Sequence, residues 1–88
     1  MKKAVIQLHA NDDIAIAGVE LDPNTELPGG LRPTGNVPVG HKIALRCIAK
    51  GQPVRRYNQI IGLASSDINT GDHVHVHNLE MVSFERDY

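Results

Sequence analysis

The sequence is poor in aromatic residues, with no tryptophan, one phenylalanine and two tyrosines, so a hydrophobic core must be built from aliphatic side chains. It also lacks any apolar run near the roughly 20 residues that a membrane-spanning helix needs. The apolar start of the chain is interrupted at Gln7 and His9, which is typical of a strand and not of a signal peptide. We therefore expect a soluble, unexported protein of the cytoplasm.

Neither sign of charge is in excess, because nine Lys and Arg residues face ten Asp and Glu residues. Proteins that bind nucleic acids through the backbone carry an excess of basic residues, so no nucleic-acid partner is expected. The single cysteine, Cys47, excludes an intrachain disulfide and is compatible with a reducing compartment. Alternation along residues 43–48 places Cys47 on one face with Ile43 and Leu45, which predicts a buried structural thiol.

A chain of 88 residues makes one small domain, which argues against a free-standing enzyme with a deep active site of its own. Eight glycines and five prolines favour short strands joined by turns. Residues 21–35 contain too many of these breakers for regular structure and are predicted to form a long loop. Strand patterns occur at residues 4–8, 14–19, 43–48, 54–57 and 59–64, although the alanines of 14–19 leave a helix possible there. The expected fold class is all-β.

Three of the five histidines, His73, His75 and His77, occupy alternate positions, with Val74 and Val76 between them. On an extended strand the imidazoles would share one face and the valines would face the core. Residues two apart on a strand are about 6.6 Å apart, so the outer rings, about 13 Å apart, could not easily share a metal ion. A metal would need one or two of these histidines plus ligands from elsewhere. Proton transfer, hydrogen bonding to a polyhydroxylated substrate and a solvated polar face are the other interpretations.

A second concentration of titratable side chains lies at Gly40-His41-Lys42, before a predicted strand. His41 either takes part in chemistry or caps a backbone carbonyl. Lys42 either takes part in chemistry or extends a solvated ammonium from a packed stem. Asn78, at the end of the histidine strand, either contacts a substrate or caps the turn. The pair Arg55-Arg56 is interpreted as a solvated face rather than an anion site.

Several segments, in this order along the chain, resemble those of a known family. They are Gly40-His41-Lys42-Ile43-Ala44-Leu45, Ile48-Ala49-Lys50-Gly51, Tyr57 followed by Ile61-Gly62, Asp67-Ile68, and Gly71-Asp72-His73-Val74-His75-Val76-His77-Asn78. Together they resemble the SAF-type domain at the start of the altronate and galactarate dehydratases, over nearly the whole chain. One departure is Asn58, where many relatives have glycine, but asparagine also tolerates a left-handed backbone.

The resemblance implies a small SAF domain with the β-clip fold, in which short, irregular strands are joined by long crossing loops. It implies a domain at residues 1–78 and, at 79–88, an exit segment or linker towards a large catalytic domain or subunit. The chain would then be the N-terminal domain or small subunit of a sugar-acid hydro-lyase, and would be inactive alone. A divalent metal, iron(II) or alternatively manganese(II), would support the chemistry.

Dehydration of a sugar acid needs a base for the proton beside the carboxylate, and an acid or metal for the leaving hydroxyl. From the two most family-like segments we expect metal ligation by His75 and His77, substrate contacts by His73 and Asn78, and catalysis by His41 and Lys42. Two alternatives remain open. One is the small subunit of a sulfolactate sulfo-lyase, which differs in the leaving group. The other is a non-catalytic SAF-type binding or assembly module, and a homo-oligomer is compatible with either.

Overall fold

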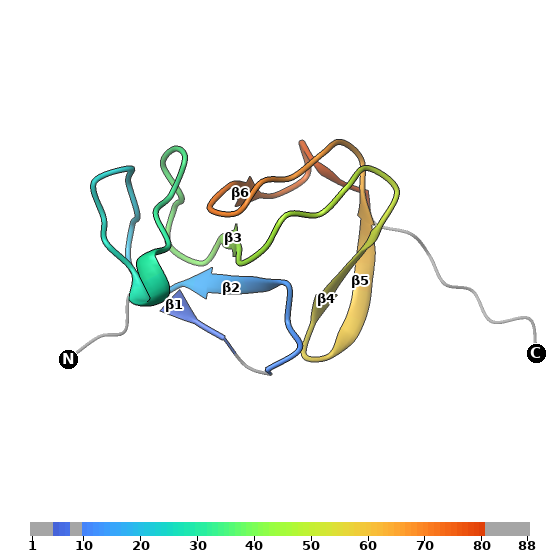
Figure 1. Cartoon of the computed structure of the whole chain (residues 1–88), viewed down its shortest axis with the longest axis horizontal. Coiled ribbons are helices and arrows are strands. Elements are labelled where there is room, and N and C mark those ends of the chain that lie inside the picture. The colour runs from blue at the N-terminus through green and yellow to red at the C-terminus, as the bar shows by residue number, and fades with distance from the viewer. Residues whose placement is uncertain (1–4, 8–9, 81–88) are drawn as a thin grey trace, which may run out of the picture.

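The structure is a computed structural model that describes residues 5–7 and 10–80 of the chain. Within them the elements are β1 (Val5–Ile6), β2 (Ile14–Ala17), the 3-10 helix η1 (Pro28–Gly30), β3 (Lys42–Ala44), β4 (Pro53–Arg56), β5 (Gln59–Ala64), β6 (His73–Val74) and β7 (Leu79–Glu80). Four strands form an antiparallel sheet in the order β1-β2-β3-β6, and three form a second in the order β4-β5-β7 (Figure 1). The all-β prediction is confirmed, and short strands with long loops match the implied β-clip.

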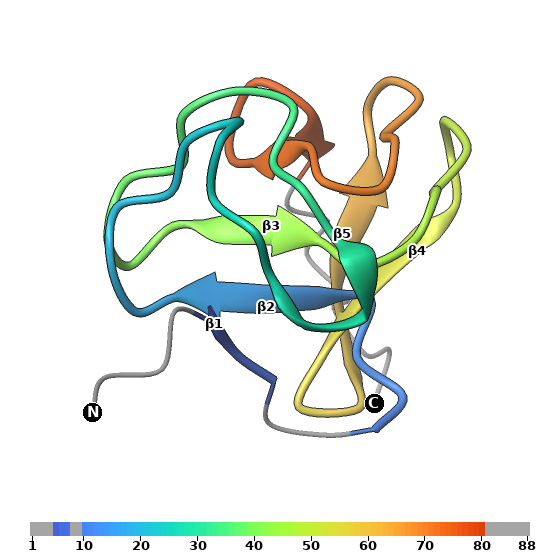
Figure 2. The same cartoon turned by 60° about the vertical axis from the view of Figure 1, so that its left-hand side comes forward.

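The first sheet brings together parts of the chain that are far apart in sequence. Strand β3 pairs on one side with β2, where Ile16 lies opposite Lys42, and on the other with β6, where Ile43 lies opposite His73. Figure 2 shows β2 and β3 side by side, with the connection between them arching above. This pairing places the Gly40-His41-Lys42 segment beside the first histidine of the C-terminal group.

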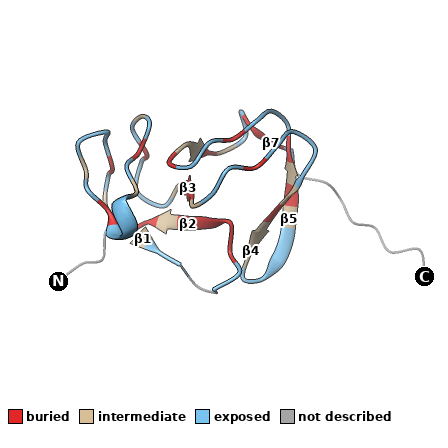
Figure 3. Ribbon diagram, in the orientation of Figure 1, coloured by how far each residue is buried: buried red, intermediate tan, exposed pale blue. Residues whose placement is uncertain are grey.

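Two aliphatic clusters form the core, and strand alternation on β2 divides its residues between them. Ile14 and Ile16 contact one cluster, whereas Ala15 and Ala17 belong to the other. The first cluster comprises Ile14, Ala44, Ile48, Val54, Ala64, Ile68, Val74 and Leu79, and the second Ala15, Ala17, Leu21, Leu27, Val37 and Ile43. Figure 3 shows buried positions along β2, β3 and the upper part of β5, while the turn between β4 and β5 is exposed. The aliphatic core predicted from the composition is confirmed.

Two buried carboxylates hold the β4–β5 hairpin against the start of β2. Asp13 Oδ2 accepts a hydrogen bond from the Arg55 backbone N–H at 2.8 Å, and Asp12 Oδ1 accepts one from the Asn58 N–H at 2.8 Å. The hairpin turn consists of Tyr57 and Asn58, with φ of 55° and 58°. Two successive left-handed residues are the geometry of a type I′ turn, so Asn58 tolerates the left-handed backbone as predicted.

The prediction that Cys47 is buried is wrong, because its side chain is exposed. Strand β3 ends at Ala44, so the alternation that placed Cys47 beside Ile43 does not continue to residue 47. The thiol instead lies 3.6 Å from the Thr70 hydroxyl, which lowers the pKa of Cys47 through a hydrogen bond.

The loop predicted at 21–35 is irregular apart from η1, and it begins at a bridge between Leu21 and Val37. At the other end of the chain, Leu79 and Glu80 form β7 against β5. Residues 81–88 lie outside the described residues, so the exit segment stays a prediction. Among the described residues, no helix is long and apolar enough to cross a membrane.

Candidate functional site

The histidine segment is a turn and not the continuous strand predicted from its alternation. Strand β6 ends at Val74, which is buried, whereas Val76 is 78% exposed instead of facing the core. The Asn78 side chain closes the turn, since its Oδ1 accepts from the His75 N–H at 3.0 Å and its Nδ2 donates to the His73 carbonyl at 2.9 Å. These bonds satisfy backbone groups that a longer β6 would have paired across the sheet.

The turn gathers the imidazoles that a strand would have spread apart. The ring centroids of His73 and His77 are 5.2 Å apart, so the separation predicted for an extended strand is wrong. His41, which precedes β3, joins them, with its Nδ1 2.8 Å from His73 Nε2 and its ring stacked on His75 at 4.3 Å between centroids. One ring nitrogen from each of His41, His73 and His75 lies within 4.8 Å of the others, and all three side chains are half-buried. We call these three residues the imidazole cluster.

Desolvation and neighbouring rings favour the neutral form of His73 and His75. Desolvation lowers the pKa of His73, and the neighbouring His41, His77 and His75 lower it further. The pKa of His75 is also lowered, by desolvation and then by His41, Lys42 and His77. Neutral imidazole is the form that binds a metal ion, so the lowered pKa values of His73 and His75 favour ligation by these two residues.

The imidazole cluster fits a divalent metal ion. Bonds of about 2.0–2.1 Å place adjacent nitrogen ligands about 3 Å apart around a metal, and the cluster's spacing of 2.8 to 4.8 Å brackets that value. Three protein ligands leave coordination positions open for a substrate. Imidazole ligands suit iron, zinc, copper and nickel, whereas manganese prefers oxygen ligands. The donor set therefore suits several divalent metals, and the identity of the metal stays a prediction.

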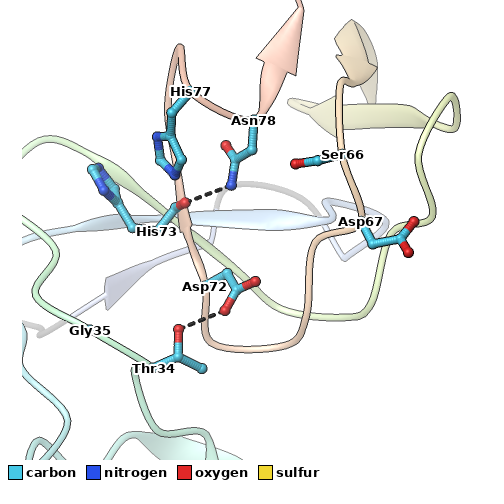
Figure 4. Close-up of a pocket in the computed structure, with 8 residues that line it drawn as sticks. All are labelled: Thr34, Gly35, Ser66, Asp67, Asp72, His73, His77 and Asn78. Atoms are coloured by element: carbon cyan, nitrogen blue, oxygen red, sulfur yellow. Dashed lines mark hydrogen bonds between the residues drawn. The ribbon is translucent and has the colours of Figure 1, made fainter.

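A polar pocket of about 310 Å³ opens beside the cluster (Figure 4). It is lined by Thr34, Gly35, Ser66, Asp67, Asp72, His73, His77 and Asn78. The Asp72 carboxylate is held in place, because it accepts hydrogen bonds from the Thr34 hydroxyl at 2.6 Å and from the Asn69 N–H at 2.8 Å. Figure 4 shows Asp67 pointing away from the two histidines. The hydroxyl, amide and imidazole groups around the pocket are suited to a ligand rich in hydroxyl groups.

Five of the six residues predicted from sequence, all except Lys42, gather at the imidazole cluster or the pocket, though in a different grouping. The predicted metal pair was His75 and His77, whereas the ligand atoms that lie close together belong to His75, His41 and His73. His77 borders the pocket. Asn78 also lines the pocket, and both ends of its amide are used in closing the turn, which is the capping role considered for it.

Some pocket residues were not found from the sequence. Thr34 comes from the long connection before β3 and Ser66 from the bend after β5. Neither has a motif around it, and only the tertiary fold brings them to the pocket. Lys42 is half-buried, and its pKa is lowered by desolvation and by the charge of Arg56.

Comparison with known proteins identifies the family. The model of the altronate/galactarate dehydratase SAF domain matches residues 3–82. The chain belongs to this family. The SAF domain is 42% identical over 76 residues to altronate dehydratase of Escherichia coli K12, and 33% identical over 79 residues to altronate dehydratase of Bacillus subtilis 168. The resemblance seen in the sequence is thereby confirmed.

The SAF domain is much shorter than these relatives. The two matches cover 83% and 86% of this chain but 15% and 16% of the respective dehydratases. A shorter relative is the (2R)-sulfolactate sulfo-lyase subunit alpha of Chromohalobacter salexigens, 43% identical over 44 residues, which are 50% of this chain and 47% of that protein. Relatives of the SAF domain therefore include both long enzymes and a short subunit.

Proposed function

We propose that the chain is the SAF domain or small subunit of a sugar-acid hydro-lyase of the altronate/galactarate dehydratase type. It would contribute a metal site to an active centre shared with a large catalytic domain or subunit. The observation that carries this proposal is the imidazole cluster beside a polar pocket, with His73 common to both. The proposed compartment is the cytoplasm, which the lone Cys47 permits because no disulfide is needed.

In this proposal His41, His73 and His75 hold iron(II), with manganese(II) the less suited alternative. When bound, the metal supplies Lewis-acid polarisation of the carboxylate and hydroxyl oxygens of the substrate. The catalytic role expected for Lys42 is not part of this proposal, because β3 pairs Lys42 with Val74, on the face of the first core cluster, and pairs Ile43, on the other face, with His73. His77 lies at the pocket, close to His73, and can hold a proton there.

The polar pocket would receive the hydroxylated carbon chain of the sugar acid. Ser66 and Thr34 offer hydroxyl groups, and the ordered Asp72 holds Thr34 in position. Because the pocket is open to solvent along the same face as the cluster, a large domain would close it and supply the remaining catalytic groups. The seam between the two parts would then run across the histidine turn.

A small subunit of a sulfolactate sulfo-lyase is the second candidate, favoured by the match to a relative named subunit alpha. It would use the same cluster to bind a carboxylate and hydroxyl pair, with sulfite as the leaving group in place of water.

A panel of sugar acids plus sulfolactate, tested as substrates, separates the two candidate functions. We expect turnover of a sugar acid only when the chain is combined with the large domain or subunit, with iron(II) present. Turnover of sulfolactate alone would select the second candidate, and no turnover of any would favour a non-catalytic binding or assembly module.

The metal site is tested on the chain itself by anaerobic calorimetric titration with iron(II). Replacing His41, His73 or His75 by alanine should weaken binding at least about tenfold, as expected for loss of a ligand. The matched control is His77→Ala, which should leave affinity within about twofold. If His77→Ala and His75→Ala abolish binding while His73→Ala does not, the pair predicted from sequence is the correct one. Unchanged binding in all variants removes the metal from this cluster.

A further inference from the structure

The polar pocket beside the imidazole cluster contains negative charge without a matching lysine or arginine. Among the described residues, its lining includes Asp67 and Asp72 and neither of those two cationic residue types. The Asp72 carboxylate is anchored, because Oδ1 accepts a hydrogen bond from the Thr34 hydroxyl and Oδ2 accepts one from the Asn69 N–H. Figure 4 shows Asp67 pointing away from Asp72, and its Oδ1 accepts from the Lys50 N–H. Asp72 is therefore the charge that a ligand in this pocket meets.

The hydrogen bonds that already exist around Asp72 leave acceptors open to a ligand. The Thr34 hydroxyl donates its one hydrogen to Asp72, so it offers a ligand lone pairs alone. A carboxylate has about four acceptor positions, and the two bonds to Asp72 leave about two of them open. The Ser66 hydroxyl and the rings of His73 and His77 can donate as well as accept. The fixed groups of the pocket thus require donors from a ligand.

These acceptors distinguish between the chemical groups that a ligand can present. A hydroxyl group brings a donor for Thr34 and Asp72 and carries no charge. A carboxylate brings acceptors alone and a negative charge beside that of Asp72, so it is disfavoured on both counts. A metal ion matches the pocket less well, because the one group of three or more potential ligands in the described part of the chain is the imidazole cluster. The pocket therefore suits an uncharged, hydroxyl-bearing segment.

We propose that Asp72 is a specificity-determining residue, which admits the hydroxyl-bearing end of a sugar acid to the pocket and excludes a carboxylate. His73 belongs to both the pocket and the imidazole cluster, so one ligand can extend from the pocket to the cluster. The carboxylate then lies towards the cluster and the opposite end lies in the pocket. An acid with a carboxylate at each end has to place one of them beside Asp72. This orientation of a substrate rests on the proposed function, whereas the selectivity of the pocket depends on neither metal nor turnover.

The test is a nuclear magnetic resonance titration of the 88-residue chain, in EDTA so that no metal takes part, and at low ionic strength because salt screens charges. The probes are galactitol, galactonate and galactarate, which share the configuration of their internal carbons and carry no, one and two carboxylates. We expect galactitol and galactonate to shift the backbone amides of the pocket residues in a saturable way. Galactarate should bind at least about threefold more weakly than galactonate, as expected for like charges that are partly exposed to solvent.

Asp72→Asn removes the charge and keeps an acceptor for the Thr34 hydroxyl. It should lower the ratio of the galactarate to the galactonate dissociation constant at least about twofold. A merely loosened pocket would instead weaken all three ligands together and leave this ratio unchanged. The matched control is Glu26→Gln, which removes the same charge from an exposed residue outside the pocket lining and should not change the ratio.

A second variant tests the same point if Asp72→Asn does not fold. Ser66 is exposed, and Figure 4 shows its hydroxyl directed towards Asn78 across the pocket. Ser66→Lys adds a cation there that compensates the charge of Asp72, so it should also lower the ratio at least about twofold.

Three results would overturn the proposal. They are galactarate binding as tightly as galactonate, an unchanged ratio in the Asp72→Asn and Ser66→Lys chains, and no saturable shift with any of the three ligands. Because the titration uses neither metal nor turnover, its failure leaves iron binding and catalysis to be judged on their own measurements. Absence of turnover with the large domain or subunit would, in turn, leave the selectivity of the pocket as measured.

Discussion

Asn78 determines where the histidine side chains lie, although it is not itself charged or titratable. Asn78 is 6% exposed, and its amide joins the His75 N–H to the His73 carbonyl across the turn. Both backbone groups belong to members of the imidazole cluster. The position of these rings therefore depends on one side chain that makes two hydrogen bonds.

Asn78→Ala should lower the free energy of unfolding by about 2 kcal/mol, because two buried backbone groups lose their partners. It should also weaken iron(II) binding, since His73 and His75 are no longer held at their present spacing. Urea unfolding and calorimetric titration measure the two effects. Asn36→Ala, at an exposed asparagine, is the control and should change neither. An Asn78→Ala chain with unchanged stability would show that the amide does not close the turn.

Residue types alone could not separate a strand from a turn at this position. Alternating histidine and valine is a strand pattern, and Val74 follows it. Val76 does not, because the amide of Asn78 competes for the backbone groups that a sheet would use. The sequence did single out the two segments whose histidines, His41, His73 and His75, come together in the structure.

At the scale of elements, two turn glycines with the same backbone conformation differ in their surroundings. Gly51 and Gly71 have φ of +86° and +92°, a region that other residues rarely adopt. A Cβ at Gly51 would meet nothing within 4 Å, whereas a Cβ at Gly71 would run into the carbonyl oxygen of Arg32. Gly71 thus allows the long loop to contact the turn before β6, where the Gly71 carbonyl accepts a 3.0 Å hydrogen bond from the Thr34 N–H.

Alanine at these two positions should have different effects. Gly51→Ala should cost about 1 kcal/mol of unfolding free energy, the ordinary cost of a left-handed backbone. Gly71→Ala should cost about 3 kcal/mol or more of unfolding free energy, because the backbone at residue 71 must also move away from the carbonyl of Arg32. Chemical denaturation of both variants measures the difference. Equal losses would mean that the loop moves away from Gly71 at no cost.

The bounds of several strands were easier to predict than which strands pair with one another. Residues 59–64 were predicted as a strand with the observed bounds, and those at 54–57 and 14–19 differed by one or two residues at their ends. The pairing of Ile43 with His73 joins residues thirty apart, and no local pattern indicates it. The cysteine error has the same origin, because alternation says nothing about where β3 ends.

At the scale of the molecule, stability should fall with acid because of the crowded histidines. The folded-state pKa values of His73 and His75 lie below the ordinary value of 6.5, so the unfolded chain binds protons more readily. The stability that the neutral His73 and His75 contribute is fully present above pH 6.5. It is progressively lost as the pH falls towards the lowered folded-state pKa values of these two residues. We expect the unfolding free energy, measured in EDTA, to decrease from about pH 7.5 to pH 5.5.

The control for this pH dependence is the double variant with His73→Asn and His75→Asn. Its stability should decrease less over the same interval, since the two groups that resist protonation are gone. Parallel curves for the two chains would place the acid sensitivity elsewhere in the molecule.

The pairing of β3 with both β2 and β6 also sets the order in which the protein can be assembled. Sheets whose neighbouring strands are distant in sequence must close long loops first, so they fold slowly compared with hairpins. During synthesis β3 can pair with β2 early, but β6 emerges about thirty residues later. The imidazole cluster, and with it the proposed metal site, can therefore form only after His73 and His75 have left the ribosome, when nearly all of the described chain has been made.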